Sequence, residues 1–192
     1  MMIYSRFLLV SAAAWALSAM VAYGQEPKIP LPLKASLVLT PEFCASEIRR
    51  GTFRERFAVG EAACTTLEPA LKGTFSSLTV TNALPTSGNS QLVLVPRFVD
   101  AGTVIGWYLL TIRQMDVFLE WTAKDMSGKT LWLETVHGSA THDPLAKHAG
   151  EDPLMGRALL KSLIANSVKD AATQSASKMC GAPELIKVAR SH

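Results

Sequence analysis

Two alternating segments in the second half of the chain constrain its fold most strongly. Residues 115–123 and 130–139 each alternate apolar with polar side chains, a period typical of half-buried strands. Between them lies Lys-Asp-Met-Ser-Gly-Lys, in which Gly128 is placed to adopt a positive φ angle. The pattern predicts an antiparallel hairpin with one buried face.

Other short runs predict further strands. Residues 36–40 form an apolar run that Pro41 stops, and residues 77–83 and 91–95 have strand-like patterns. The segment 104–111 fits either another strand or a loop. Together with the hairpin, these runs predict a mostly antiparallel sheet of four to five strands.

Two helices complete the expected fold. Apolar side chains recur at helical spacing from about Ala58 to Gly73. Asp152 and Pro153 form a typical helix start, and the second helix continues to about Met179. The order strand, helix, strands, helix predicts an α+β fold with two helices packed on one face of the sheet.

The first 24 residues have the parts of a secretory signal peptide. Arg6 precedes an apolar run from Phe7 to about Val21, and small residues stand at the −3 and −1 positions of a cut before Gln25. An uncleaved membrane anchor is the alternative, but the run is shorter than the ~20 residues that a spanning helix needs. The mature chain contains no further run of this kind, so we expect no transmembrane segment after signal removal.

The mature chain is expected to contain one domain. Residues 25–35 form a proline-rich, extended leader, residues 36–181 form the single α+β domain, and residues 182–192 form a flexible tail. The residue after the expected cut is Gln25, and the first cysteine is Cys44, so we expect no lipidation. The predicted location is the bacterial periplasm, in soluble form.

Three cysteines follow the signal: Cys44, Cys64 and Cys180. In an oxidising compartment one pair can form, and three pairings are possible. We favour Cys44–Cys180, because it would tie the two ends of the domain together and close the longest loop. Three thiols without a disulfide are the alternative.

Three histidines, His137, His142 and His148, lie close together in sequence, with carboxylates nearby. Converging imidazoles and carboxylates bind zinc or copper. Their spacings of five and six match no chelating pattern on a helix or hairpin, so an ordinary solvated loop is favoured. Metal binding by this loop stays an open question, and no metal site is assigned.

Catalytic patterns are not found. Residues 123–130 match a relaxed phosphate-binding loop, but Thr130 opens a strand where that loop requires a helix. The chain has no Gly-x-Ser-x-Gly, no His-Glu-x-x-His and no Cys-x-x-Cys motif. We therefore expect no enzyme activity, no catalytic residues and no cofactor, with an enzyme of unrecognised type as an alternative.

Charge and aromatic residues are weaker guides to a partner. The net charge is +3 and 48% of the residues are hydrophobic, which argues against nucleic acid and against disorder. Four arginines within residues 49–56 could meet anionic lipid or polysaccharide, but a solvated surface is favoured. Trp107, Trp121 and Trp132 are expected in the core or in hairpin pairs rather than on a sugar-binding platform.

Two stretches carry a family resemblance. The segment from Arg56 to Ala62 (Arg-Phe-Ala-Val-Gly-Glu-Ala), entering a helix, and the hairpin from Asp125 to Trp132 resemble small periplasmic α/β domains of outer-membrane assembly and export accessory lipoproteins. Examples are the curli-secretion and polysaccharide-export accessory proteins and the amino-terminal domain of the Tol translocation protein. The resemblance implies a non-catalytic role in which a sheet edge or helix face binds partner proteins.

The sequence thus predicts an exported, non-enzymatic accessory or adaptor protein of the cell envelope that acts through protein–protein contacts. A periplasmic binder of a small ligand, lipid or polysaccharide is the second possibility, and it would need an apolar pocket between helix and sheet. An envelope protein is the expected partner. Its identity and the oligomeric state are not indicated by the sequence.

Overall fold

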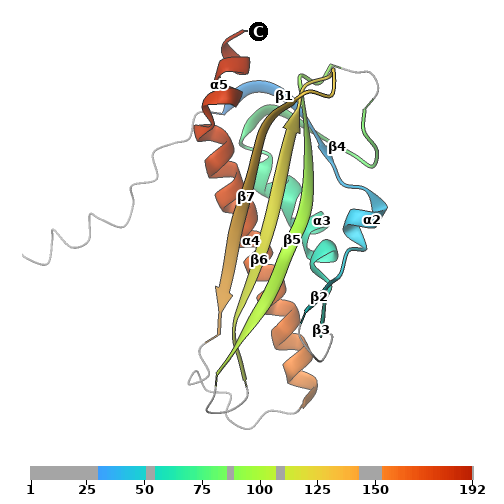
Figure 1. Cartoon of the computed structure of the whole chain (residues 1–192), viewed down its shortest axis with the longest axis vertical. Coiled ribbons are helices and arrows are strands. Elements are labelled where there is room, and N and C mark those ends of the chain that lie inside the picture. The colour runs from blue at the N-terminus through green and yellow to red at the C-terminus, as the bar shows by residue number, and fades with distance from the viewer. Residues whose placement is uncertain (1–29, 51–54, 86–88, 107–110, 143–152, 192) are drawn as a thin grey trace, which may run out of the picture.

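A five-stranded sheet forms the centre of the molecule. The computed structural model describes residues 30–50, 55–85, 89–106, 111–142 and 153–191. The strands lie in the order β4-β1-β5-β6-β7 (Figure 1). Their bounds are β1 (Leu31–Val38), β4 (Phe75–Thr81), β5 (Leu92–Gly106), β6 (Thr111–Lys124) and β7 (Thr130–Thr141).

Helices cover one face of this sheet. The helices of the described ranges are α2 (Pro41–Cys44), α3 (Val59–Leu71), α4 (Pro153–Gly181) and α5 (Pro183–Arg190). In Figure 1, α3 and α4 lie behind the sheet, and α5 extends past its end. The predicted α+β class, with helices on one face, is confirmed.

Most of the strand pairing is antiparallel, as predicted. β5, β6 and β7 follow one another as a meander, whereas β1 runs parallel to both of its neighbours, β4 and β5. The predicted hairpin turn is confirmed: Gly128 has a φ of 86°. Asp125 holds the turn, because its Oδ1 accepts hydrogen bonds from the amides of Ser127 and Lys129 at 2.9 and 3.0 Å.

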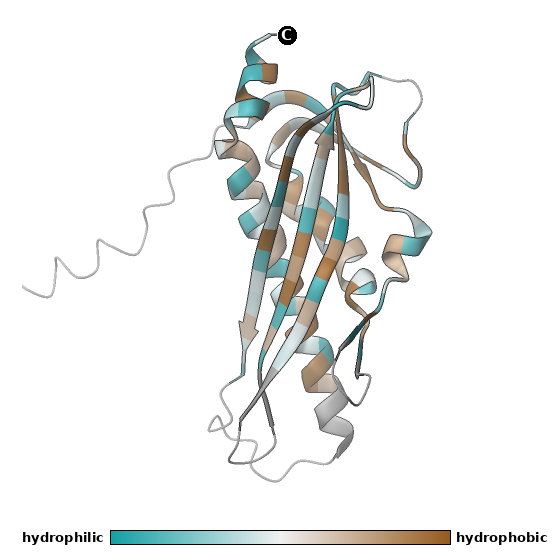
Figure 2. Cartoon of the chain, in the orientation of Figure 1, coloured by the Kyte–Doolittle hydropathy of each residue, from teal (hydrophilic) through white to brown (hydrophobic). Residues whose placement is uncertain are grey.

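The core lies between the sheet and the long helix α4. On β6, alternate side chains are fully buried, and they pack against buried residues of α4 (Met115, Val117, Leu119, Trp121 and Ala123 with Val168, Ala171 and Ala172). The resulting alternation of hydrophobic and hydrophilic residues is visible along the strands in Figure 2. One face of the meander is therefore buried, and no helix of the described ranges covers the opposite face.

Helix α4 approaches β7 unusually closely at one glycine. A Cβ atom added to Gly138 would lie 2.1 Å from the backbone oxygen of Ser167 and 2.5 Å from the amide nitrogen of Ala171. Such distances leave no room for a side chain. Gly138 therefore allows the backbones of the strand and the helix to pack against each other.

Two expected boundaries differ from the structure. β1 begins at Leu31, so the last five residues of the expected leader belong to the sheet, where Leu31 and Leu33 are buried. The expected flexible tail is helix α5: Pro183 occupies its first turn and Leu185 is fully buried. Residues 1–24 of the predicted signal lie outside the described residues.

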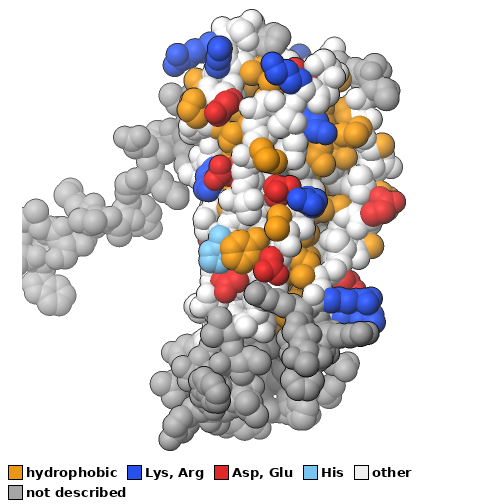
Figure 3. Space-filling model, in the orientation of Figure 1, with side chains coloured by type: hydrophobic (Ala, Val, Ile, Leu, Met, Phe, Trp, Pro, Cys, Tyr) orange, Lys and Arg blue, Asp and Glu red, His pale blue; other side chains and the backbone are white. Residues whose placement is uncertain are grey.

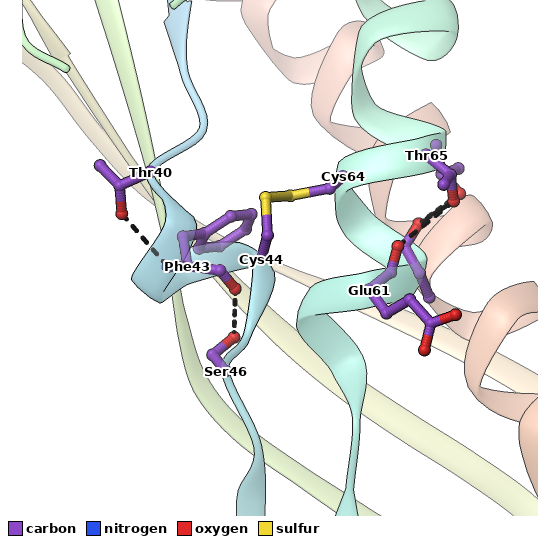
Figure 4. Close-up of a disulfide and its surroundings, with 9 residues drawn as sticks. Thr40, Phe43, Cys44, Ser46, Glu61, Cys64 and Thr65 are labelled. Atoms are coloured by element: carbon purple, nitrogen blue, oxygen red, sulfur yellow. Dashed lines mark hydrogen bonds between the residues drawn. A yellow bond between two sulfur atoms is a disulfide. The ribbon is translucent and has the colours of Figure 1, made fainter. Parts of the chain in front are cut away.

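The predicted disulfide was wrong in one partner. Cys44 bonds to Cys64, with the Cα atoms 5.6 Å apart, and not to Cys180 (Figure 4). The bond joins α2 to α3, whose first turn packs so closely on α2 that a Cβ on Gly60 would meet the carbonyl oxygen of Phe43 at 2.2 Å. Cys180 lies near the end of α4. Because α2 packs on α3, the thiol of Cys64 is the one that meets Cys44.

A small hairpin was also missed by the sequence analysis. β2 (Ile48–Arg50) and β3 (Glu55–Phe57) pair antiparallel and carry part of the arginine group. Phe57 is buried in the core, and Arg56 is exposed and lies 3.9 Å from Glu47. The solvated surface position favoured for the arginines fits Arg56, which is exposed. Arg54, another member of that group, lies outside the described residues.

Candidate docking site at the edge of strand β7

The uncovered face of the meander carries an ordered set of polar side chains. These residues alternate with the buried ones along β6, and charged and hydrophobic side chains of this face are interspersed (Figure 3). Arg97 of β5 lies opposite Glu120 of β6 and donates from Nε and Nη2 to Glu120 Oε1 at 3.1 and 2.9 Å. This ion pair is exposed on the arginine side, so its contribution to stability is small.

A second cluster lies further along the same face. His137 Nε2 is 2.9 Å from Asp116 Oδ1, and the His137 ring stacks on Phe118 with the ring centroids 4.7 Å apart. Partial burial raises the pKa of Asp116, but hydrogen bonds from Gln114, His137 and Ser139 and the charge of His137 outweigh it. The net pKa of Asp116 is therefore lower than its ordinary value, and the carboxylate stays ionised.

The histidine group predicted from sequence does not converge on a metal site in the described residues. His137 faces Asp116, His142 follows the end of β7, and His148 lies outside the described residues. Within the described ranges, no group of three or more His, Cys, Asp and Glu side chains could hold a metal ion.

Two of the three tryptophans bear out the expected core role: Trp121 is fully buried and Trp132 is 8% exposed. Trp107 lies outside the described ranges.

One edge of the sheet is formed by β7. Among the described residues, β7 is the last strand of the sheet and pairs only with β6. The amide of Ser139 points away from β6, because it donates to Asp170 Oδ2 of α4 at 2.9 Å. Backbone groups alternate in direction along an antiparallel strand, so the N–H and C=O groups of Leu133, Thr135 and His137 also point to the free edge.

A groove runs beside this edge. Its volume is about 550 Å³, and it lies between the strand and the junction of α4 with α5, lined by Leu131, Trp132, Leu133, Glu134, Lys178, Gly181, Ala182, Pro183 and Glu184. Lys178 on α4 donates to Glu134 on β7. Leu133 is 58% exposed and adds an apolar side chain beside the groove. We call the free edge of Leu133–His137 together with this groove the docking edge.

A second groove lies on the helix layer. It has a volume of about 310 Å³ and an apolar floor from α3 and α4 that includes Ala62, Leu160 and Ile164. Lys161 and Glu61 face each other across it at 3.5 Å, both highly exposed. Sequence reasoning found neither groove, because both depend on which distant elements become neighbours.

None of the helices within the described ranges combines the length and the hydropathy that crossing a membrane requires.

The fold is similar to those of two solved bacterial proteins, one of them a lipoprotein. The structure is similar to the minor lipoprotein of Acinetobacter baumannii, with a TM-score of 0.51 and 12% identity over 79% of this chain and 93% of that chain. It is also similar to a protein of Xanthomonas campestris from the family DUF330, with a TM-score of 0.50 and 10% identity over 86% of this chain and 91% of that chain. No protein-family model matches the sequence, and no curated protein matches it.

Proposed function

We propose that this chain is an exported, non-enzymatic accessory protein of the bacterial envelope that acts by binding another protein. The observation that carries the proposal is the docking edge, where an unpaired strand edge, an exposed leucine and a groove come together. Such an edge is a template for adding a strand from a partner. The likeness to the Acinetobacter lipoprotein supports the envelope assignment at the level of the fold.

The charged groups of the open face support a binding role over a catalytic one. Asp116 and Glu120 are each held by a cationic or hydrogen-bonding neighbour on an adjacent strand. Carboxylates held in this way are ordinary surface pairs. General acid–base catalysis would instead require a group with its pKa moved toward neutrality, whereas the pKa of Asp116 is moved in the opposite direction.

The place of Cys44 in the fold bears on how the protein would reach its partner. Lipoproteins are anchored through a cysteine next to the signal cleavage site, and here Cys44 follows β1 and is bonded to Cys64. Its thiol is therefore not available for acylation. We propose that the mature chain moves freely in the periplasm and depends on protein contacts for its position.

A periplasmic ligand binder is the second candidate. That function would need an apolar pocket between the helices and the sheet. Met115, Leu119 and Trp121 fill this space and are fully buried against α4. The apolar groove between α3 and α4, which lies outside this space, is the observation that keeps the candidate open.

Crosslinking in intact host cells tests the proposal. The tagged full-length protein is crosslinked, and captured proteins are identified by mass spectrometry. The matched control is the same chain without residues 1–24, which stays in the cytoplasm. We expect one envelope protein to be captured reproducibly by the exported form and not by the control. Capture of the same abundant proteins by both forms would contradict the proposal.

A further inference from the structure

We propose that the docking edge binds an extended segment of another envelope protein by strand addition, and that this segment carries an apolar residue beside Leu133 and a Lys or Arg facing Glu184. The inference rests on the proposed function and specifies its surface and the chemistry of the partner. The added segment would become the sixth strand of the sheet, next to β7.

The backbone of β7 offers a short, regular row of hydrogen-bonding groups. Leu133, Thr135 and His137 each direct one N–H and one C=O to the free edge, as the alternation from Ser139 requires. The row ends at Ser139, whose amide is already bound by Asp170. An added strand can therefore pair along five residues, which corresponds to about 17 Å.

Asp170 of α4 occupies the edge of β7 at Ser139, but among the described residues the stretch Leu133–His137 has no such cover. Proteins commonly blunt such edges with Lys, Pro or an inward charge. The strand contains neither Lys nor Pro, and its one carboxylate, Glu134, is held by Lys178. At 12 residues β7 is also longer than β4, the 7-residue strand at the opposite edge of the sheet. Within the part of the chain that the structure describes, this stretch of β7 is therefore the edge to which a partner strand can be added.

The side chains around the edge define what the partner must carry. On the open face, Leu133 is 58% exposed and offers an apolar contact to a neighbouring strand. On the helix side, the groove has apolar walls in Trp132, Ala182 and Pro183. Glu184 is exposed at the groove, and among the described residues no cation lies within ion-pair distance of it. A basic side chain on the partner would complement this charge.

A second copy of the chain fits this edge less well. Strand pairing between two copies is antiparallel about a two-fold axis. For pairing along Leu133–His137 the axis passes through Thr135, so Glu184 at the groove end of one copy lies toward the Ser139 end of the other, where Asp170 is a second carboxylate and not a cation. Like charges at an interface oppose association. The charges therefore favour a different protein as the occupant.

Site-specific photo-crosslinking in host cells tests the inference. A benzophenone amino acid replaces Leu133 in the full-length protein, and in separate strains it replaces Thr173, which is exposed on α4 and does not line the groove. Mass spectrometry identifies the crosslinked peptide of the partner. We expect capture from position 133 only, with the crosslink inside an extended segment that contains an apolar residue and a nearby Lys or Arg.

Two pairs of variants test the strand addition itself. Thr135→Pro removes one N–H from the free edge and leaves the bonds to β6 in place, because the amide of Thr135 points away from β6. With the crosslinker at position 133, this variant should lower capture at least tenfold, and Thr135→Ala should change it less than twofold. Glu184→Lys should lower capture about tenfold, and Glu184→Gln less. Circular dichroism confirms that each variant is folded; if Thr135→Pro is not, Glu184→Lys decides.

The outcomes are distinct. Capture of the partner from position 173 but not from position 133 would overturn the inference and leave the proposed function standing. Capture of a second copy of this chain, or capture that Thr135→Pro and Glu184→Lys do not change, would also overturn the inference. If neither position captures any protein, both the inference and the proposed function fail.

Discussion

The indole of Trp121 on β6 donates from Nε1 to Ser175 Oγ on α4 at 2.7 Å, and both residues are fully buried. Ser175 in turn donates to the carbonyl oxygen of Ala171 at 2.7 Å. The largest side chain of the core is thus joined to the backbone of the helix that covers it. This relay fixes α4 along the sheet, because a buried indole N–H without a partner is unfavourable.

The relay predicts the effect of removing the acceptor. Ser175→Ala leaves the indole N–H without its partner and should lower the free energy of unfolding by about 1–3 kcal/mol. Thr173→Ala is the control, because Thr173 makes a similar bond to its own helix at the surface, and it should change stability by less than about 0.5 kcal/mol. Urea unfolding measures both. Equal effects would show that the indole finds another acceptor.

The close packing at Gly138 predicts that adding a single methyl group there lowers the stability of the fold. An added methyl group would lie 2.1 Å from Ser167 O, so Gly138→Ala must push α4 away from β7. We expect a loss of at least about 2 kcal/mol in the free energy of unfolding, measured by urea unfolding. Gly73→Ala is matched in chemistry but has open space around it, and it should be nearly neutral. A neutral Gly138→Ala would contradict the close packing.

The Cys44–Cys64 disulfide predicts a specific response to reductant. The bond closes a loop with a sequence separation of 20 residues, which in the chain-entropy model stabilises the fold by about 3 kcal/mol. Reducing agent should therefore lower the stability of the wild type and of Cys180→Ser. It should have no effect on the Cys44→Ser/Cys64→Ser variant, which starts at the lower value. A response that disappears in Cys180→Ser would point to a pairing with Cys180.

Asp116 predicts a contribution to stability that depends on pH. Its pKa is lower in the folded protein than in the unfolded chain, so the folded state favours the ionised form. The contribution is present above the unfolded value of about 4 and is lost as pH falls through the lower folded value. Asp116→Asn should be less stable than the wild type at pH 5, and the difference should shrink toward pH 2, as measured by thermal unfolding. A difference of the same size at pH 5 and pH 2 would contradict this prediction.

The sequence was informative where local pattern decides structure. Alternation along residues 115–123 identified both the strand and its buried face, and Gly128 identified the turn. It was less informative where distant segments meet. Nothing near Cys44 indicates that α2 will pack on α3, and the pairing with Cys64 follows from that contact.

The docking edge could not be predicted for the same reason. β1 pairs with β5 on the side away from β6. The meander β5-β6-β7 is therefore extended at β5, and β7 is left as the edge strand at its other end. That order depends on parallel pairing between segments far apart in the sequence. The alternation of β7 is the same for an edge strand as for an internal one, and only the order of the whole sheet distinguishes them.

The position of β1 also has a kinetic consequence. Leu37 pairs with Val80 on one side and with Leu94 on the other, whereas β5, β6 and β7 each pair with the next strand along the chain. Contacts between distant segments form slowly, so we expect the meander to assemble first and β1 to insert afterwards. The strand synthesised first therefore waits longest for its neighbours. During that interval its buried leucines are exposed, and the nascent chain is most open to capture by chaperones or by aggregation.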